Sequence, residues 1–235
     1  MLHVNAPEAA AALSRISPAV WRGRYRIGFW AYELPVIPSS WAKTARFFHE
    51  LWVPSRFVAD ALKAAGVTTP VRVMPHPVAL SAPEHAQTAG DGRFTVLAMG
   101  DLNSSWTRKN LLGSIEIFKR AFPDVSSETR RLIVKVQSSG ANPNFDRVLH
   151  AALAGRADIA FLNQRLSDAE IDMLVSSADV FLSPHRSEGY GLVLAEALLA
   201  GVPALATGWS GNVDFMGGIP ELCIDHHLVS VRDAG

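Results

Sequence analysis

The sequence predicts an α/β fold built on parallel sheets of the Rossmann-like type. Short apolar runs rich in Val, Ile and Phe alternate with longer segments of helical periodicity, which is the pattern of βαβ units. The chain has 235 residues, of which 49% are hydrophobic. This length allows one large domain, or one complete and one partial domain, around a sizeable core.

The alternation is most regular from Arg93 onward, where it predicts a doubly wound domain. We expect strands at 94–99, 132–137, 159–162, 180–183 and 203–206, and helices at 110–122, 145–154, 168–176 and 191–200. Pro123 closes the first of these helices, and Ser167 with Glu170 forms a capping box before the third. Gly201 is placed to end the fourth helix in the C′ position.

The region before Arg93 predicts a smaller set of elements. Strands are expected at 25–30, 51–54 and 71–74, and helices at 40–48 and 56–65. Three strands make only part of a Rossmann-like domain. A segment rich in Pro, Ala, Gly and polar residues follows. We therefore expect a partial N-terminal domain over 1–78, a linker over 79–92 and a nearly complete C-terminal domain over 93–235.

Composition excludes several classes of function. The 22 basic and 22 acidic side chains balance and form no basic run, which argues against nucleic acid as a partner. Cys223 is the single cysteine, so neither an internal disulfide nor a Cys-rich zinc site is expected, and a cytoplasmic location is the simplest interpretation. The longest apolar stretch, 192–206, is interrupted by Glu, Gly and Pro and falls short of the ~20 residues of a membrane span. The first twenty residues lack the pattern of a secretory signal.

The most informative segment is Ser-Pro-His-Arg-Ser-Glu-Gly-Tyr-Gly-Leu-Val-Leu-Ala-Glu, over 183–196. It follows a predicted strand at the sheet edge where open α/β folds bind ligands. Gly189 and Gly191 would let the backbone approach a ligand, and the amides of 190–192 would form a helix N-terminus that attracts phosphate. Each residue alone is also compatible with an ordinary strand-to-helix turn. Together they favour a site.

Two carboxylates flank this predicted anion site. Seven residues separate Glu188 from Glu196, a span of up to ~12 Å if it were helical. That exceeds the ~5–9.5 Å between the carboxylates of a glycosidase, and an extended ligand with sugar, diphosphate and ribose fits better. Glu196 could instead be a solvated helix residue, but it is surrounded by apolar residues that make its burial costly without polar partners. A nicotinamide motif is excluded because its third glycine would fall at Leu194.

A second loop, 100–110, also follows a strand and opens a helix. Arg108 and Lys109 could neutralise a diphosphate, and the loop offers hydroxyls at Ser104, Ser105 and Thr107. The alternative is a helix cap with two solvated cations. Both this loop and the Glu188 loop follow strands and point to the same edge of the sheet, which favours a phosphate-binding site over a simple helix cap.

These motifs resemble those of a known enzyme family. The two glutamates at their spacing, the preceding Ser-Ala-Asp-Val-Phe-Leu-Ser-Pro, and Ala-Glu-Ala followed by Gly-Val-Pro resemble the C-terminal half of a retaining glycosyltransferase of family four, which has the GT-B fold. The resemblance extends over about 24–216 and includes the segments 28–35, 52–57 and 75–77. It implies that Glu188 contacts the donor sugar as the catalytic residue, Glu196 the ribose hydroxyls and Lys109 the diphosphate.

The remaining donor contacts follow from the same resemblance and from position. The resemblance implies that backbone amides of Gly189, Tyr190, Gly191 and Leu192 contact phosphate and sugar. Gly211 and Asn212 follow the strand 203–206 on the same side and are expected to line the sugar pocket. Many family members carry an Arg where this chain has Ser104, so Arg108 is expected to substitute or one phosphate contact to be absent.

Other polar residues give weaker signals. His185 and Arg186 lie within the predicted site and could touch the donor or make a structural hydrogen bond. His226 and His227 beside Asp225 are better explained as a polar turn than as a metal site, because adjacent histidines point in different directions.

The resemblance implies transfer of a hexosyl group from a nucleotide-diphosphate sugar to a hydroxyl acceptor with retention of configuration. The acceptor would be a glycan or a lipid-linked sugar, and the process glycan biosynthesis. No metal or other cofactor is expected. The location would be cytoplasmic, with a peripheral position at the membrane as an alternative. Most of the family's N-terminal domain and the final helices have no counterpart here, so we expect a truncated member that self-associates through 1–74. A non-catalytic nucleotide-sugar-binding remnant and a GT-B-type epimerase are the competing interpretations.

Overall fold

The computed structural model describes residues 1–79, 91–137 and 143–230. Its contacts divide the chain into two compact units. Unit 1 contains Met1–Val78 and two short loops from later in the chain, Ser187–Leu192 and Ser210–Phe215. Unit 2 contains Ala79–Arg186, Val193–Trp209 and Met216–Gly235. The predicted linker 79–92 lies almost entirely outside the described residues, so the predicted domain limits stay a prediction.

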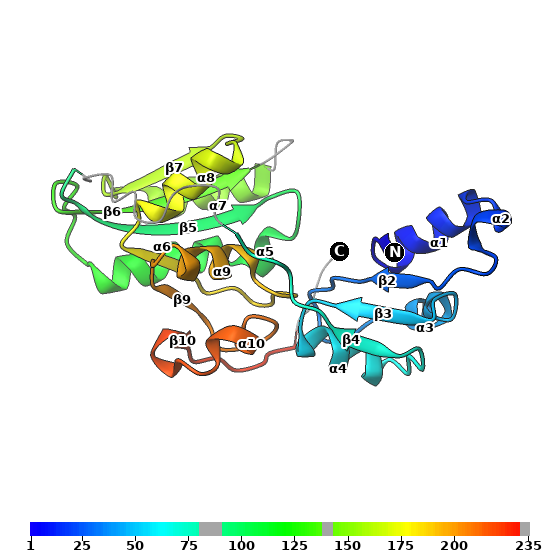
Figure 1. Cartoon of the computed structure of the whole chain (residues 1–235). Helices are drawn as coiled ribbons and strands as arrows, with labels where there is room; N and C mark the ends of the chain where they lie inside the picture. The colour runs from blue at the N-terminus through cyan, green and yellow to red at the C-terminus, as the bar shows by residue number, and fades with distance from the viewer. Residues whose placement is uncertain (80–90, 138–142, 231–235) are drawn as a thin grey trace. The chain divides into compact units, whose positions relative to one another are not determined.

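Unit 1 is a small parallel sheet with helices. Its strands are β1 (Leu2–His3), β2 (Ile27–Phe29), β3 (Glu50–Val53) and β4 (Val71–Val73), in the order β1-β2-β3-β4 (Figure 1). Its helices are α1 (Ala6–Arg15), α2 (Pro18–Trp21), α3 (Ser39–Ala45) and α4 (Arg56–Ala64). Ser55 caps α4, because its side chain accepts a hydrogen bond from the backbone of Val58.

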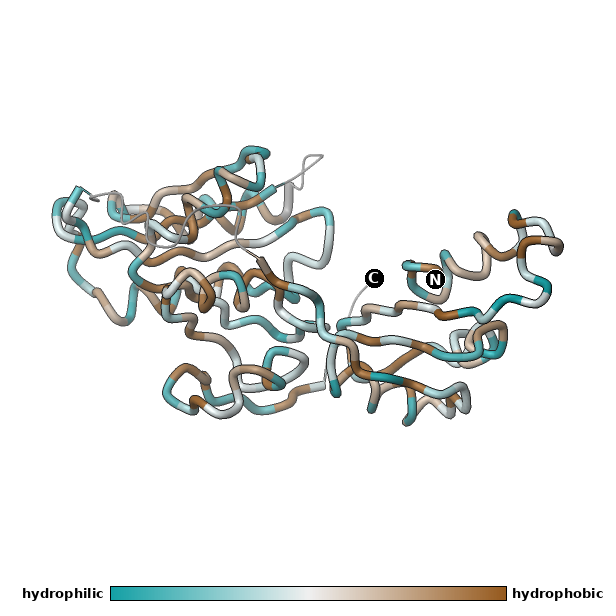
Figure 2. The backbone as a smooth tube through the Cα atoms, in the orientation of Figure 1, coloured by the Kyte–Doolittle hydropathy of each residue, from teal (hydrophilic) through white to brown (hydrophobic). Residues whose placement is uncertain are grey.

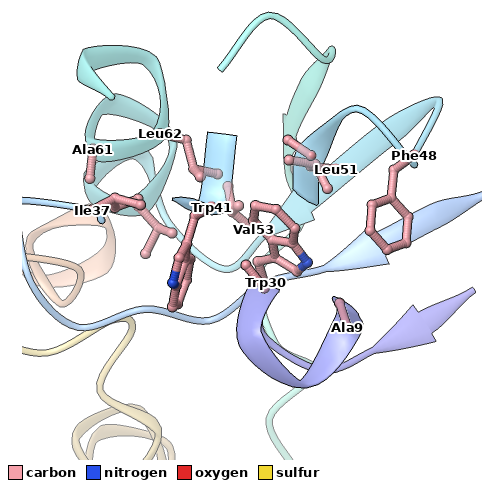
Figure 3. Close-up of a cluster of buried hydrophobic side chains, with 12 residues drawn as sticks. Ala9, Trp30, Ile37, Trp41, Phe48, Leu51, Val53, Ala61 and Leu62 are labelled. Carbon is pink, nitrogen blue, oxygen red and sulfur yellow. The ribbon is translucent and has the colours of Figure 1, made fainter. Parts of the chain in front are cut away.

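Two tryptophans form the centre of the unit 1 core. Trp30 is fully buried and meets Trp41 edge to face, with 5.8 Å between ring centroids. Phe48 packs against Trp30 in the same way at 6.0 Å. Figure 3 shows these rings beside Leu51 and Val53 of β3 and Ala61 and Leu62 of α4. Each aromatic pair of this kind adds ~0.5–1.5 kcal/mol beyond the burial of its surface.

Unit 2 is built on a six-stranded parallel sheet. Its strands are β5 (Phe94–Asp101), β6 (Arg130–Gln137), β7 (Ile159–Asn163), β8 (Val180–Ser183), β9 (Ala204–Thr207) and β10 (Cys223–Ile224). They lie in the order β10-β9-β8-β5-β6-β7. This is the doubly wound order, in which the chain runs outward from β5 in one direction and later continues from β8 in the other. The predicted α/β, Rossmann-like fold class is confirmed.

Helices connect these strands. They are α5 (Trp106–Lys109), α6 (Leu111–Ala121), α7 (Pro143–Leu153), α8 (Asp168–Ser176), α9 (Leu192–Leu199) and α10 (Val213–Met216), with a 3₁₀ turn, η1, at Pro220–Leu222. One face of β5 and β6 packs against α6 and α7 through the buried residues Ala98, Val134, Phe118 and Phe145. In Figure 2 hydrophobic residues concentrate on strands and helices, while many connecting loops are hydrophilic. None of the helices in the described part of the chain combines the length and apolar character that crossing a membrane requires.

Several local predictions are confirmed in detail. The bounds of α8 and β8 are those predicted, and Ser167 and Glu170 form the reciprocal capping box. Gly201 has φ of 76° and ends α9, with its N–H bonded to Leu198 O at 3.1 Å and the next N–H, that of Val202, bonded to Ala197 O at 2.9 Å. This pair of bonds is the Schellman motif.

Other local predictions were wrong. The N-terminal region has a fourth strand, β1, and a helix, α1, that were not expected. A two-residue strand is too short to show alternation, and the inward positions of α1 include Ala6 and Ala9, which give a weak hydrophobic signal. The predicted loop 100–110 contains the helical turn α5. Asn110, its last residue, separates α5 from α6 in the left-handed conformation, with φ of 53°.

Candidate functional site

The carboxyl ends of β5 and β8 define the candidate site within unit 2. These strands are parallel neighbours in the sheet. From β5 the chain continues to β6 on one side, and from β8 it continues to β9 on the other side. The junction of β5 and β8 is therefore the topological switch point. Ligands of open α/β sheets bind in the crevice that opens at such a point. The loop that follows each strand carries residues predicted to bind the donor.

The loop after β5 is ordered by its own hydrogen bonds. Asp101 Oδ1 accepts bonds from the backbone N–H and the side-chain amide of Asn103, both at 2.8 Å. Ser104 Oγ donates to the carbonyl of Asp101 at 3.0 Å, and Ser105 Oγ accepts from the backbone of Arg108 at 3.3 Å. The hydroxyl of Ser104 thus already has a partner within its loop, and Ser105 serves as the N-cap of α5.

Arg108 and Lys109 follow on α5 with different degrees of exposure. Arg108 is buried, with 7% of its surface exposed, whereas Lys109 is half-buried. A Cβ placed on Gly100, in β5, would lie 3.4 Å from the Cβ of Lys109, so the root of the lysine side chain lies against the end of that strand. The structure therefore places Lys109 at the carboxyl edge of β5.

Hydrogen bonds within unit 2 join the ends of three neighbouring strands. The backbone N–H of Arg186 donates to the carbonyl of Arg108 at 2.8 Å, and Asn110 Nδ2 donates to the carbonyl of Pro184 at 2.7 Å. Thr207 Oγ1, at the end of β9, donates to the carbonyl of His185 at 2.6 Å. In each bond the segment 184–186 contributes a main-chain atom, either an N–H or a carbonyl oxygen. The segment is therefore held in place by its main chain. His185 itself is 1% exposed, and Arg186 is exposed.

Glu196 lies half-buried on α9 in unit 2. Burial raises the pKa of its carboxyl group, and the nearby carboxylates of Asp172 and Asp168 on α8 raise the pKa further. An ionised carboxylate in this environment has a cost to folding. Perturbed pKa values occur preferentially at functional sites, which keeps Glu196 a candidate for the site.

Glu188 lies in unit 1, on the loop Ser187–Leu192, and is 8% exposed. Its backbone N–H donates to Ser210 Oγ at 2.8 Å, and its carbonyl accepts from the N–H of Gly211 at 2.9 Å. The structure thus brings the Glu188 loop together with the loop that carries Gly211 and Asn212. Asn212 is fully buried.

The glycines of these two loops are required by the protein's own backbone. A Cβ on Gly189 would lie 2.6 Å from the carbonyl oxygen of Tyr32, and a Cβ on Gly211 would overlap the carbonyl of Gly189. Ser55 Oγ also donates to the Gly189 carbonyl, and Ser187 Oγ donates to the carbonyl of Glu33. Close approach at Gly189 was predicted for a ligand, and the structure shows it for Tyr32.

Gly191 forms the turn before α9, close to the turn that the sequence predicted at this position. Gly191 has φ of 93°, a conformation that favours glycine, and α9 begins at the next residue, Leu192. The ring of Tyr190 packs at a tilt against Phe215 and edge to face against His76, with centroid distances of 5.2 and 5.4 Å. The strand-to-turn-to-helix arrangement that the sequence predicted is therefore present.

A comparison with protein families decides the classification. The sequence profile described as "Family 4 Glycosyltransferase in conflict systems" matches residues 55–235, well over half of the chain. The chain belongs to the family 4 glycosyltransferases. The match includes both glutamates and the loop with Lys109. A search of curated proteins found no match.

Solved structures support the GT-B fold of this family 4 chain. The structure of E. coli trehalose-6-phosphate bound with UDP-2-fluoro glucose aligns with a TM-score of 0.69 at 13% identity, covering 95% of this chain and 61% of that one. Anabaena HepE in complex with UDP and glucose gives 0.62 at 18%, covering 80% and 54%. A variant of S. aureus TarM with UDP gives 0.65 at 14%, covering 89% and 42%. The chain thus spans less than two thirds of the length of each.

Sequence reasoning missed two serines that contact the backbone of the loop carrying Glu188. Ser55 stands directly before the predicted helix 56–65, so its capping role was readable, but its bond to Gly189, which is 134 positions away, was not. Ser210 was not singled out, although it bonds to the backbone of Glu188.

Proposed function

We propose that this family 4 chain binds a nucleotide-diphosphate sugar and transfers its hexosyl group to a hydroxyl acceptor with retention of configuration. The observation that carries the proposal is the arrangement at the switch point of unit 2. There Arg108 and Lys109 follow the end of β5, and their loop is bonded to the segment that leaves β8. Cations fixed beside a strand end suit a diphosphate leaving group.

The proposed roles follow the residues' positions. Lys109 and Arg108 would hold the diphosphate, with Ser104 and the amides of 190–192 as further donors of hydrogen bonds. Glu196 would bind the ribose hydroxyls, and Glu188, with Gly189, Gly211 and Asn212, the sugar. A bound hydroxyl pair would compensate the carboxylate of Glu196, whose pKa is raised by burial.

The comparisons support the donor class and the stereochemistry. The HepE and TarM structures contain bound UDP, and trehalose-6-phosphate synthase is an enzyme of glycosyl transfer with retention. Uridine-diphosphate sugars are therefore the first donors to test. The acceptor is proposed as a glycan or a lipid-linked sugar. A cytoplasmic location, a peripheral position at the membrane and self-association through 1–74 remain part of the proposal.

A paired binding and turnover experiment tests this function. A panel of nucleotide-diphosphate sugars is screened by thermal shift, and each binder is incubated with glycan and lipid-linked acceptors. NMR then reports the anomeric configuration of the product. We expect stabilisation by one nucleotide class and a product that retains the donor configuration. Binding without transfer would favour a non-catalytic remnant, and conversion of the donor without an acceptor would favour an epimerase.

A further inference from the structure

Lys135 occupies an unusual position in the sheet of unit 2. It lies on β6, paired with Met99 of β5 on one side and with Leu162 of β7 on the other. Its neighbours along the strand, Val134 and Val136, belong to the core that packs against α6 and α7. Because side chains alternate along a strand, Lys135 faces the opposite side of the sheet, in a row with Met99 and Leu162.

The lysine is almost entirely buried in that row. Only 5% of its surface is exposed. Burial lowers its pKa, and the carboxylate of Asp101 partly opposes this effect. A lysine removed from water among apolar neighbours has a large cost unless an anion compensates it, and such residues are rarely buried without a partner.

The protein supplies little compensation. Within residues 1–79, 91–137 and 143–230, no hydrogen bond or ion pair involves the Lys135 ammonium group. Asp101 influences it only at a distance, and the Oδ1 atom of Asp101 already accepts two bonds from Asn103. A lysine with 5% of its surface exposed therefore lies near the carboxyl edge of the sheet, and its ammonium group has no bonded counter-charge in the described part of the chain.

The position of this cation matches the proposed diphosphate site. Lys135 pairs with Met99, one residue before Gly100, and the root of Lys109 lies against Gly100. Gly100 and Val136 are partners on the α6 face, whereas Lys135 and Met99 are partners on the other face. The two lysines thus lie near the carboxyl end of β5 on opposite faces of the sheet, and Lys135 is on β6, the neighbour of β5 on the side away from β8.

We propose that Lys135 is a second phosphate-binding lysine, which contacts the diphosphate of the donor and is neutralised by it. This inference rests on the proposed function, because the anion is the diphosphate of the nucleotide sugar. Arg108 and Lys109 on the loop and Lys135 on the strand then supply three cations. A diphosphate that enters would replace the water that the lysine lost on folding.

Calorimetry on the 235-residue chain tests the inference with a nucleoside, its monophosphate and its diphosphate, using the base that the wild type prefers. Lys135→Met keeps the length of the side chain and removes its charge. We expect diphosphate affinity to fall 10- to 150-fold, the equivalent of ~1.5–3 kcal/mol for a hydrogen bond to a charged group, while nucleoside affinity is unchanged. Arg120→Met removes a charge from an exposed position of α6 in the same unit and should change neither affinity.

A second variant covers the case in which Lys135→Met does not fold. Lys135→Gln removes the charge and keeps a polar side chain at this position. We expect the same loss of diphosphate affinity with unchanged nucleoside affinity. Equal diphosphate affinity in the wild type and in the variant that folds would overturn the inference and leave donor binding intact. A wild type that binds no nucleoside diphosphate would overturn the proposed function as well.

Discussion

Ser55 Oγ donates a hydrogen bond of 2.6 Å to the carbonyl oxygen of Gly189, and both residues belong to unit 1. The same hydroxyl accepts a bond from the N–H of Val58 at the start of α4. One fully buried serine therefore caps a helix and holds the backbone of the residue that follows Glu188. The backbone beside a proposed catalytic carboxylate is therefore held by a hydroxyl that also begins a helix.

Ser55→Ala should destabilise the protein more than the loss of an ordinary helix cap. The cap alone accounts for ~1 kcal/mol, and the buried Gly189 carbonyl loses a partner at ~1–3 kcal/mol. Ser167→Ala is the matched control, because Ser167 caps α8 within an exposed capping box. Urea denaturation measures both variants, and hydrogen exchange should show faster opening of 187–192 in Ser55→Ala alone. Equal destabilisation would mean that the bond to Gly189 contributes nothing.

Gly211→Ala should disrupt the paired loops of unit 1. A Cβ at this position would overlap the carbonyl of Gly189, and backbone atoms cannot move aside as a flexible side chain can. We expect a loss of ~1–3 kcal/mol or more, the range for overpacking. Gly218→Ala is the control, since nothing lies within 4 Å of its Cβ position. Thermal denaturation compares the two, and equal melting temperatures would show that the loops are looser than the structure indicates.

The sequence was sufficient for features that depend on local pattern. The bounds of α8, its capping box and the C′ role of Gly201 all follow from residues within a few positions of one another. Contacts between distant segments were not accessible in this way. Gly189 could be recognised as a close-approach residue, but only the folded chain shows that the approaching atom belongs to Tyr32. The burial of Lys135 likewise depends on strand order, which brings Met99 and Leu162 beside it.

Glu196→Gln should stabilise the protein without ligand at neutral pH. The folded state raises the pKa of Glu196, chiefly by burial, so the folded protein binds this proton more readily than the unfolded chain. The wild type therefore loses stability as pH rises through the raised pKa, whereas Gln has no charge to lose. Below the ordinary value near 4.5 the two proteins should be equally stable. Urea denaturation from pH 4 to pH 8 tests this, and a difference independent of pH would contradict it.

Lys109→Ala should weaken the binding of nucleoside diphosphates. Loss of a hydrogen bond to a charged phosphate reduces affinity by ~1.5–3 kcal/mol, and the effect should be absent for the nucleoside. Isothermal titration measures both ligands. Lys119→Ala offers a control in unit 2, because Lys119 donates to the carbonyl of Ala152 and has no proposed role at the site. Unchanged diphosphate affinity in Lys109→Ala would remove this lysine from the site.

The two glutamates should have separable effects on ligands that share only part of their chemistry. A nucleoside diphosphate and its sugar conjugate both contain ribose, and only the conjugate contains the sugar. Glu196→Gln should therefore weaken binding of both, while Glu188→Gln should spare the nucleotide and impair binding or turnover of the sugar nucleotide. Because Glu188 is held through its backbone N–H and carbonyl, Glu188→Gln retains those bonds and tests the carboxylate alone. Equal losses for both ligands in both variants would refute the separate roles proposed for the two carboxylates.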